Sequence, residues 1–230
     1  MSAPAAGLVW VPQAYTHSVN NVADAEQGHP RKWLVLILVA TGTFAGTLDI
    51  SIIDIALPTL TRVFRVTITI SQWFLLAYAL TNTFLLPAAG KASDLFGRRR
   101  VYVWGLVIFA IGSLASGLSF SAPMLIVTRA FQGIGSAILI AGGPPLLIAA
   151  FPKAQRGRSL GFMGIGVGLG MLAGPLVGGL LVHHAGWRWI FLVNVPIAAI
   201  AAYIMWRMIE NLNEGARGKL DVAGTALLAV

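Results

Sequence analysis

The sequence predicts an all-α membrane protein, a bundle of six transmembrane helices built from two three-helix repeats. Hydrophobic residues make up 57% of the 230-residue chain and charged residues only 10%, whereas soluble domains carry about 25% charged residues. Apolar runs long enough to cross a bilayer, about 20 residues each, occur repeatedly. Lysine and arginine gather in alternate connections between these runs, as membrane topology requires. These observations exclude a disordered chain and an ordinary soluble enzyme.

Each span is predicted from an apolar run between polar or charged residues. The runs lie at 33–57, 71–89, 101–118, 123–147, 160–182 and 189–208. A seventh run begins at 220, but its residues to 230 would rise only about 16 Å, roughly half of a 30 Å hydrocarbon core. We therefore expect a six-helix transmembrane bundle over 31–210. A cytoplasmic loop and the start of a truncated seventh helix follow over 211–230.

The first thirty residues are predicted to be a disordered cytoplasmic tail. They are rich in alanine, proline and polar residues. They lack the basic segment and following apolar run of a secretory signal. Termini of this kind are usually poorly ordered, and a tail without a role is the simplest interpretation.

The net charge of +8 indicates orientation rather than binding to nucleic acid. With the N-terminus inside, twelve of the sixteen basic residues fall in inner segments and three in outer ones. The positive-inside rule then places the N-terminus in the cytoplasm of a multi-pass protein of the plasma (inner) membrane. The lipid bilayer, not nucleic acid, is the expected partner. The chain has no cysteine, so disulfides and thiolate metal sites are excluded.

Charged residues inside predicted spans are candidates for function, because charge within a bilayer is costly. Asp49 lies about 24 Å from the cytoplasmic end of the first span, and Arg129 about 9 Å from the outer end of the fourth. Both therefore fall in the outer half of the core at similar depth, where they could pair. Such a pair could couple proton binding to substrate binding, or it could be a static contact that orients two helices.

Asp54 is a weaker candidate for the same proton-coupling role. It lies five residues after Asp49, about 140° around a helix, so the two carboxylates cannot share a face. It also lies near the predicted outer end of the span, before Pro58. A solvated terminal residue and a functional one are both open interpretations.

The second span carries polar and aromatic side chains that could line a substrate cavity. Trp73 and Tyr78 could stack on aromatic or cationic compounds, although an interfacial aromatic belt is the more frequent arrangement. Asn82 and, on the fourth span, Gln132 could bind substrate or bridge helices. No acidic or cysteine partners accompany the adjacent His183 and His184, so no metal site is predicted.

The connection over 90–100 is predicted to be a tight turn of at most ten residues. Gly90 and Gly97 suit close approach or a positive φ. Asp94 could cap a helix or pair with Arg98. The segment has a fixed spacing of two glycines around Asp94, followed by Arg98 and Arg99. This pattern is more specific than the positive-inside rule requires of a basic loop.

The fifth span is unusually rich in glycine and contains one internal proline. Glycine lets helices approach closely in lipid, and the proline removes one backbone donor and is expected to bend the helix. A kinked packing helix is the simpler interpretation. The residues concerned are Gly161, Gly170, Gly174, Pro175, Gly178 and Gly179.

Taken in order, these segments resemble the motifs of the major facilitator superfamily. The 90–100 segment is similar to its cytoplasmic gating loop, and 48–58 is similar to the first-helix motif of its drug:proton antiporters. The 129–135 segment resembles the fourth-helix motif whose arginine is linked to proton coupling. The fifth-span glycines resemble the antiporter motif of exporters, and 187–196 is similar to the fourteen-helix branch. The resemblance covers about 31–230.

The resemblance implies the N-terminal half of a multidrug-type antiporter that exports small amphipathic or cationic compounds by alternating access. Asp49, tuned by Arg129, would carry the proton, and the proton gradient would replace any cofactor. The missing C-terminal half, or a second copy, would complete the cavity. An exporter of a native metabolite, antibiotic or siderophore stays open, as does a non-transporting fragment. We find no phosphate-binding loop and no nucleophile–base constellation that would indicate an enzyme.

Overall fold

The computed structural model describes residues 28–209. The predicted tail falls outside the described residues except for its last three positions, and so does the predicted loop and seventh-helix start over 211–230. Within 28–209 the chain is all-helical, and six helical segments are long and apolar enough to cross a membrane. The predicted six-helix fold class is therefore confirmed.

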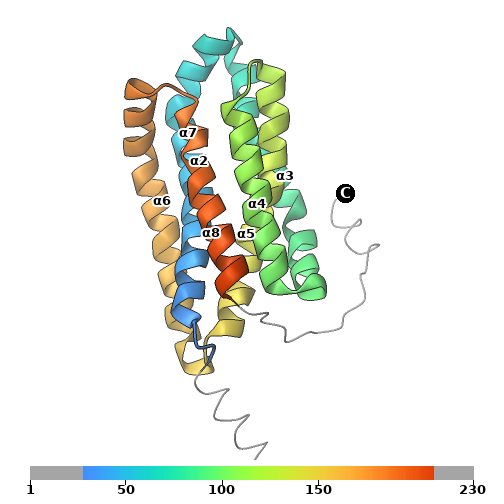
Figure 1. Ribbon diagram of the computed structural model, residues 1–230. Coiled ribbons are helices and arrows are strands. Elements are labelled where there is room, and N and C mark those ends of the chain that lie inside the picture. Colours follow the sequence, from blue (N-terminus) through green and yellow to red (C-terminus); the bar gives the residue numbers. More distant parts are fainter. Residues whose placement is uncertain (1–27, 210–230) are drawn as a thin grey trace, which may run out of the picture.

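The helices follow the predicted order (Figure 1). Their bounds are α2 Lys32–Phe64, α3 Ile68–Phe96, α4 Arg98–Gly117, α5 Ala122–Ala150, η1 Lys153–Gln155, α6 Arg156–His184, α7 Trp189–Leu192 and α8 Asn194–Met208. The short helix α7 and the helix α8 together form the sixth span, Trp189–Met208.

The first helix is longer than its apolar run indicated, so the prediction that it ends near residue 57 was wrong. Pro58 lies inside α2 and removes one backbone donor, but the helix continues for six more residues. Leu60, which is fully buried, and Phe64 pack with the aromatic side chains of Phe74 and Trp187. This packing stabilises the extra turns, and the helix ends at Arg65, whose φ of 52° is left-handed.

The packing of the helices has the internal repetition that two three-helix repeats predict. The most extensive contacts join α2 to α6 and α3 to α5. In two three-helix repeats, α2 corresponds to α5, α3 to α6 and α4 to α8. The α2–α6 contact of one repeat order therefore becomes the α5–α3 contact of the other. The burial of the spans follows the same repetition. Helices α3 and α6 occupy the same place in their repeats, and they are the two least buried spans.

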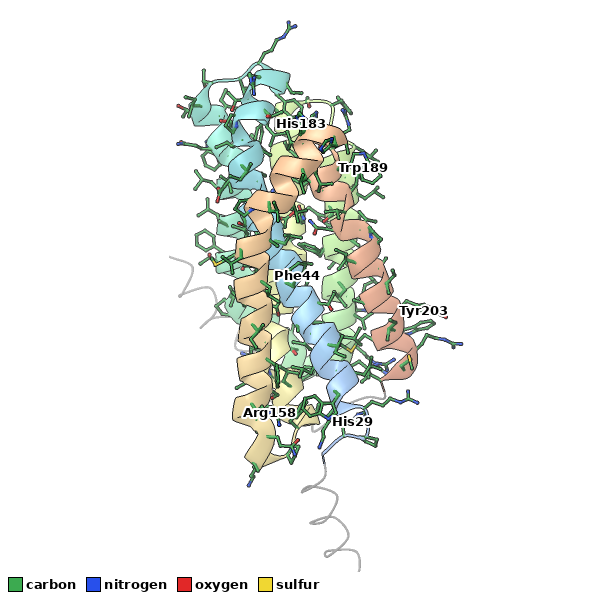
Figure 2. All side chains as sticks on the ribbon, turned by 90° about the vertical axis from the view of Figure 1, so that its left-hand side faces the viewer. His29, Phe44, Arg158, His183, Trp189 and Tyr203 are labelled. Atoms are coloured by element: carbon green, nitrogen blue, oxygen red, sulfur yellow. The ribbon has the colours of Figure 1, made fainter. Side chains whose placement is uncertain are left out.

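The connections between helices lie at two opposite ends of the bundle, as the charge pattern requires. Figure 2 shows His29 and Arg158 at one end and His183 and Trp189 at the other. At the His29 end, Arg31 donates to the backbone carbonyl of Met208, the last residue of α8. Arg99 donates to the carbonyls of Met205, at 3.1 Å, and Trp206. Basic side chains thus bind the exposed carbonyls at the C-terminal end of a helix.

Candidate functional site

A buried ion pair lies inside the bundle. Nη1 of Arg129, on α5, is 2.5 Å from Oδ2 of Asp49, on α2. Asp49 is 2% exposed and Arg129 is fully buried. The two residues that the depth argument placed at one level are therefore in contact, although their role in proton coupling stays a prediction.

Three donors converge on the carboxylate of Asp49. Arg129 binds Oδ2, while the side-chain amides of Gln132 and Asn194 donate to Oδ1 at 3.0 and 3.1 Å. Gln132 comes from α5 and Asn194 from the first position of α8. The carboxylate accepts each of these three hydrogen bonds. The site therefore joins α2, α5 and α8 through a single side chain.

The guanidinium group of Arg129 is held by several further contacts. Its Nε donates to the backbone carbonyl of Phe74, on α3, at 3.0 Å, and its Nη1 donates to Oε1 of Gln132 at 2.7 Å. Its carbon lies 4.3 Å from the centre of the Tyr78 ring and 5.7 Å from that of Phe191, which are cation–π distances. Among the described residues, Nη2 has no hydrogen-bond partner.

The residues proposed for a substrate cavity lie in two different environments. Tyr78 and Asn82 are buried and donate to the hydroxyl of Ser136 at 2.7 and 2.8 Å, while Gln132 is occupied inside the ion-pair site. Trp73, in contrast, is 45% exposed. Three of the four side chains are bonded across helices, which is the bridging interpretation, and Trp73 lies apart from them.

A shallow groove does exist, on a different face. It has a volume of about 290 Å³ and lies between α2 and α6. Its lining is almost entirely apolar and consists of Ile37, Ala40, Thr41, Phe44, Phe162, Ile165, Gly166 and Leu169. Figure 2 shows Phe44 of this set beside α6, about halfway along the bundle. A groove of this kind suits the apolar part of a small molecule.

Asp54 lies apart from the ion pair. Its side chain is exposed, whereas that of Asp49 is buried. This agrees with the helical geometry that separated the two faces. Among the described residues, Arg129 therefore pairs with Asp49 and not with Asp54.

The connection over 90–100 is tight, as predicted, and it is much shorter than the upper limit of ten residues. Helix α3 continues to Phe96 and α4 begins at Arg98, so Gly97 alone breaks the helix, with a φ of 95° that glycine tolerates. Gly90 is helical, and nothing among the described residues lies within 4 Å of the position a Cβ would take. The prediction that Gly90 lies in the turn was wrong, because α3 remains regular beyond its apolar run.

Asp94 takes one of its two predicted roles. Its carboxylate lies 3.4 Å from Nη2 of Arg98, an i,i+4 ion pair, and both side chains are partly exposed. It does not cap α4, whose N-cap residue is Gly97. Arg98 also donates to the carbonyl of Pro145, on α5, at 3.2 Å. The pair therefore fastens the junction between α3 and α4 to α5.

The glycines of α6 fall on two faces. A Cβ on Gly170 would lie 2.9 Å from the carbonyl oxygen of Phe44, and one on Gly174 would collide with Ser51. Gly178 faces Ile52 in ordinary contact. These three positions let α6 pack closely on α2.

The other face of α6 is open. The prediction of tight packing at Gly161 was wrong for the described residues, because nothing lies within 4 Å of its Cβ position, and the same holds for Gly179. Leu172 and Leu176, which flank Gly174 and Pro175, are 78% and 68% exposed. The helix continues through Pro175 to His184. The glycines of α6 therefore lie on two faces of the helix, and α2 covers only one of these faces.

Sequence reasoning missed three polar residues of the site: Ser113, Ser136 and Asn194. Nε2 of Gln132 donates to Ser113 at 2.7 Å, and Ser136 accepts from Tyr78 and Asn82. Asn194 lies in the 187–196 segment that carries part of the family resemblance, but no role at the ion pair was predicted for it. Serine residues in lipid-spanning helices carry little signal of their own, because they also bond to their own backbone.

A comparison with known families decides the identity. Residues 39–228 match the family described as the Major Facilitator Superfamily. The chain belongs to this superfamily. The match covers every helix of the structure except the first turns of α2.

Several curated relatives of this superfamily member have assigned names. It is 40% identical over 201 residues to the riboflavin transporter RibZ of Clostridioides difficile, covering 86% of this chain and 44% of that protein. It is 37% identical over 199 residues to the multidrug resistance protein Stp of Mycobacterium tuberculosis, covering 86% and 37%. It is 32% identical over 195 residues to the putative multidrug resistance protein MdtD of Salmonella typhi, covering 85% and 41%. The chain therefore spans less than half the length of these relatives.

Solved structures show the same fold at low sequence identity. A bacterial homologue of the human lysosomal transporter Spinster, inward-facing and unoccupied, superposes with a TM-score of 0.72 at 20% identity, over 84% of this chain and 46% of that one. A D-xylose–proton symporter gives 0.67 at 20% identity, over 78% and 48%. The chain has the architecture of one part of these transporters.

Proposed function

We propose that this superfamily member contributes a six-helix bundle to a proton-coupled exporter of small amphipathic or cationic compounds. The exporter would lie in the plasma membrane with the N-terminus of this chain in the cytoplasm. The observation that carries the proposal is the buried pair of Asp49 and Arg129, because ionisable residues inside a membrane bundle are rare and mark ion or proton pathways. The multidrug-resistance names of two relatives support the substrate class.

The proposed mechanism uses the charge state of one carboxylate. While Asp49 is charged, Arg129, Gln132 and Asn194 hold α2, α5 and α8 together around it. A proton from the outside would neutralise Asp49 and remove its attraction for Arg129, which weakens this contact between the helices. The bundle could then rearrange and release substrate outward, and loss of the proton to the cytoplasm would restore the pair. Asp54 has no part in this proposal.

The proposal includes a second helical bundle, supplied by the C-terminal half of the transporter or by a second copy. Alternating access places a substrate site between two such bundles. The surfaces that support this are those of α3 and α6, the two least buried spans. The open α6 face with Gly161 and Gly179 would be one side of the contact, and the apolar groove between α2 and α6 would contribute to the site.

A native metabolite is the second candidate substrate. The relative that carries the name riboflavin transporter is 40% identical over 86% of this chain. The apolar groove between α2 and α6 suits a planar aromatic metabolite as well as it suits a drug. The two substrate classes share the proposed proton chemistry and differ only in what occupies the groove.

The experiment is exchange transport in proteoliposomes made with the full chain. An imposed pH gradient should drive accumulation of an amphipathic cation, or of riboflavin if the second candidate holds, and each should move protons in the opposite direction. Cross-linking then shows whether a second copy completes the carrier. If neither compound and no protons move, both with this chain alone and with the C-terminal half of the transporter supplied, the result would support a non-transporting fragment and contradict the proposal.

A further inference from the structure

Asn194 is the one buried amide at the ion pair that is bonded at only one end. Its Nδ2 donates to Asp49, but its Oδ1 is buried and has no hydrogen-bond partner among the described residues. An unpartnered buried carbonyl destabilises a fold, and native structures avoid most of them. Its presence beside a titratable group calls for a physical reason.

The neighbouring amide of Gln132 makes the contrast clear. Its Nε2 donates both to Asp49 and to Ser113, and its Oε1 accepts from Arg129. Turning this amide over would break three hydrogen bonds at once. Turning the amide of Asn194 over breaks one, and it brings an acceptor to the place where a donor had been.

Few other groups near Asp49 could change their hydrogen bonding or their charge when Asp49 is protonated. The titratable groups that face it are Arg129 from α5 and Tyr78 from α3. From α8 it meets Asn194, which does not titrate, and α7 has no ionisable residue. On α4, Ser113 reaches it through Gln132. The ionisable residues of α6 are confined to its two ends.

We infer that Asn194 is a positioning residue that binds Asp49 in both of its charge states, donating to the carboxylate and accepting from the carboxylic acid. When a hydronium ion gives a proton to Oδ1 of Asp49, one O–H bond of the hydronium ion breaks, one O–H bond forms on Oδ1, and a neutral water molecule is left. The side chain of Asn194 turns about its Cβ–Cγ bond, gives up its N–H donor contact, and accepts the new O–H with its Oδ1. The protonated site then has an acceptor for its new proton, while the Nδ2 group moves to the place that Oδ1 had occupied.

This inference rests on the proposed function in one respect, since it takes Asp49 as the group that binds the proton. The test is infrared difference spectroscopy of the full chain between high and low pH, with the asparagine side-chain carbonyls labelled with ¹³C. Acid should produce a carboxylic-acid band that is lost in Asp49→Asn. Together with it, one labelled carbonyl band should move to lower frequency, because accepting an O–H weakens the C=O bond. This second change should be lost in Asn194→Leu, or in Asn194→Ser if the first variant does not fold.

The matched control is Asn82→Leu, which removes the other asparagine of the described residues. Asn82 is buried and bonded to Ser136, not to Asp49, so the shifted band should remain in this variant. If the Asp49 band appears but the labelled carbonyl band keeps its frequency or moves to higher frequency, the role of Asn194 alone would be overturned. Absence of the Asp49 band would overturn both this inference and the proposed function. The paired shifts in a protein that does not transport even when the second bundle is supplied would support Asn194 and contradict the exporter.

Discussion

At the scale of single residues, the ion pair is the most demanding feature of the bundle. Burying a carboxylate and a guanidinium is costly unless each finds its partner and further hydrogen bonds. Asp49 and Arg129 meet this condition through Gln132, Asn194 and the carbonyl of Phe74. Each charge is therefore tolerated because of the other, and removing one should harm the protein more than removing both.

This coupling can be measured with a double-mutant cycle on unfolding in detergent. Asp49→Leu and Arg129→Met should each destabilise the bundle by about 3–5 kcal/mol, because each leaves an uncompensated buried charge. The double variant should lose clearly less than the sum. As a control, Asp94→Leu and Arg98→Met remove a partly exposed pair and should show a coupling of at most about 1 kcal/mol. Strict additivity at the buried pair would contradict the interpretation.

The sequence was sufficient to predict this pair but not its surroundings. Helical rise alone places Asp49 and Arg129 at similar depth, and costly charges at one depth are expected to meet. Asn194 and Ser113 could not be predicted in the same way. Whether an amide or a hydroxyl reaches a carboxylate depends on how each helix is rotated about its axis, and that rotation is set by packing.

At the scale of elements, glycine decides how closely the helices approach. Gly170 and Gly174 bring α6 against α2. Gly133 does the same for α5 and α3, where a Cβ would lie 2.7 Å from the carbonyl oxygen of Tyr78.

Apolar runs predicted the spans well, but the predicted helix ends were wrong at Pro58 and over 90–96. Helix ends are set by capping and by packing, which hydropathy does not register.

A matched pair of alanine substitutions on α6 tests this account of glycine. Gly170→Ala should lower the free energy of unfolding by about 1–3 kcal/mol, because the new methyl group meets backbone atoms of α2 that cannot move aside. Gly161→Ala enters open space on the same helix and should be neutral or slightly stabilising, since alanine is the better helix former. Equal losses at the two positions in thermal unfolding would show that α6 does not pack on α2 as described.

At the scale of the whole molecule, internal repetition accounts for both the covered and the open surfaces. The α2–α6 and α3–α5 contacts exchange when the two three-helix repeats are exchanged. The same exchange relates α3 to α6, the least buried spans. The sequence predicted two repeats, but it could not predict which helices would be left open, because that follows from the arrangement of the helices in space.

The absence of cysteine from the chain makes the open surfaces accessible to single-cysteine labelling. Leu172→Cys on α6 and Trp104→Cys on α4 replace residues that are 78% and 64% exposed in the bundle. In the assembled transporter, a lipid-soluble maleimide should react much more slowly at position 172, because the proposed second bundle would cover α6 and leave α4 exposed to lipid. Similar rates at both positions would contradict the proposed interface.

The central claim is that Asp49 carries the proton that drives export, and one transport measurement tests it most directly. Proteoliposomes of the unmodified chain, of Asp49→Asn and of Asp54→Asn are compared for substrate efflux as the imposed pH gradient is varied. Asp49→Asn should lose the dependence of efflux on the gradient. Asp54→Asn should keep it, because its side chain is exposed and away from Arg129. An Asp49→Asn protein that exports substrate with unchanged pH dependence would contradict the account.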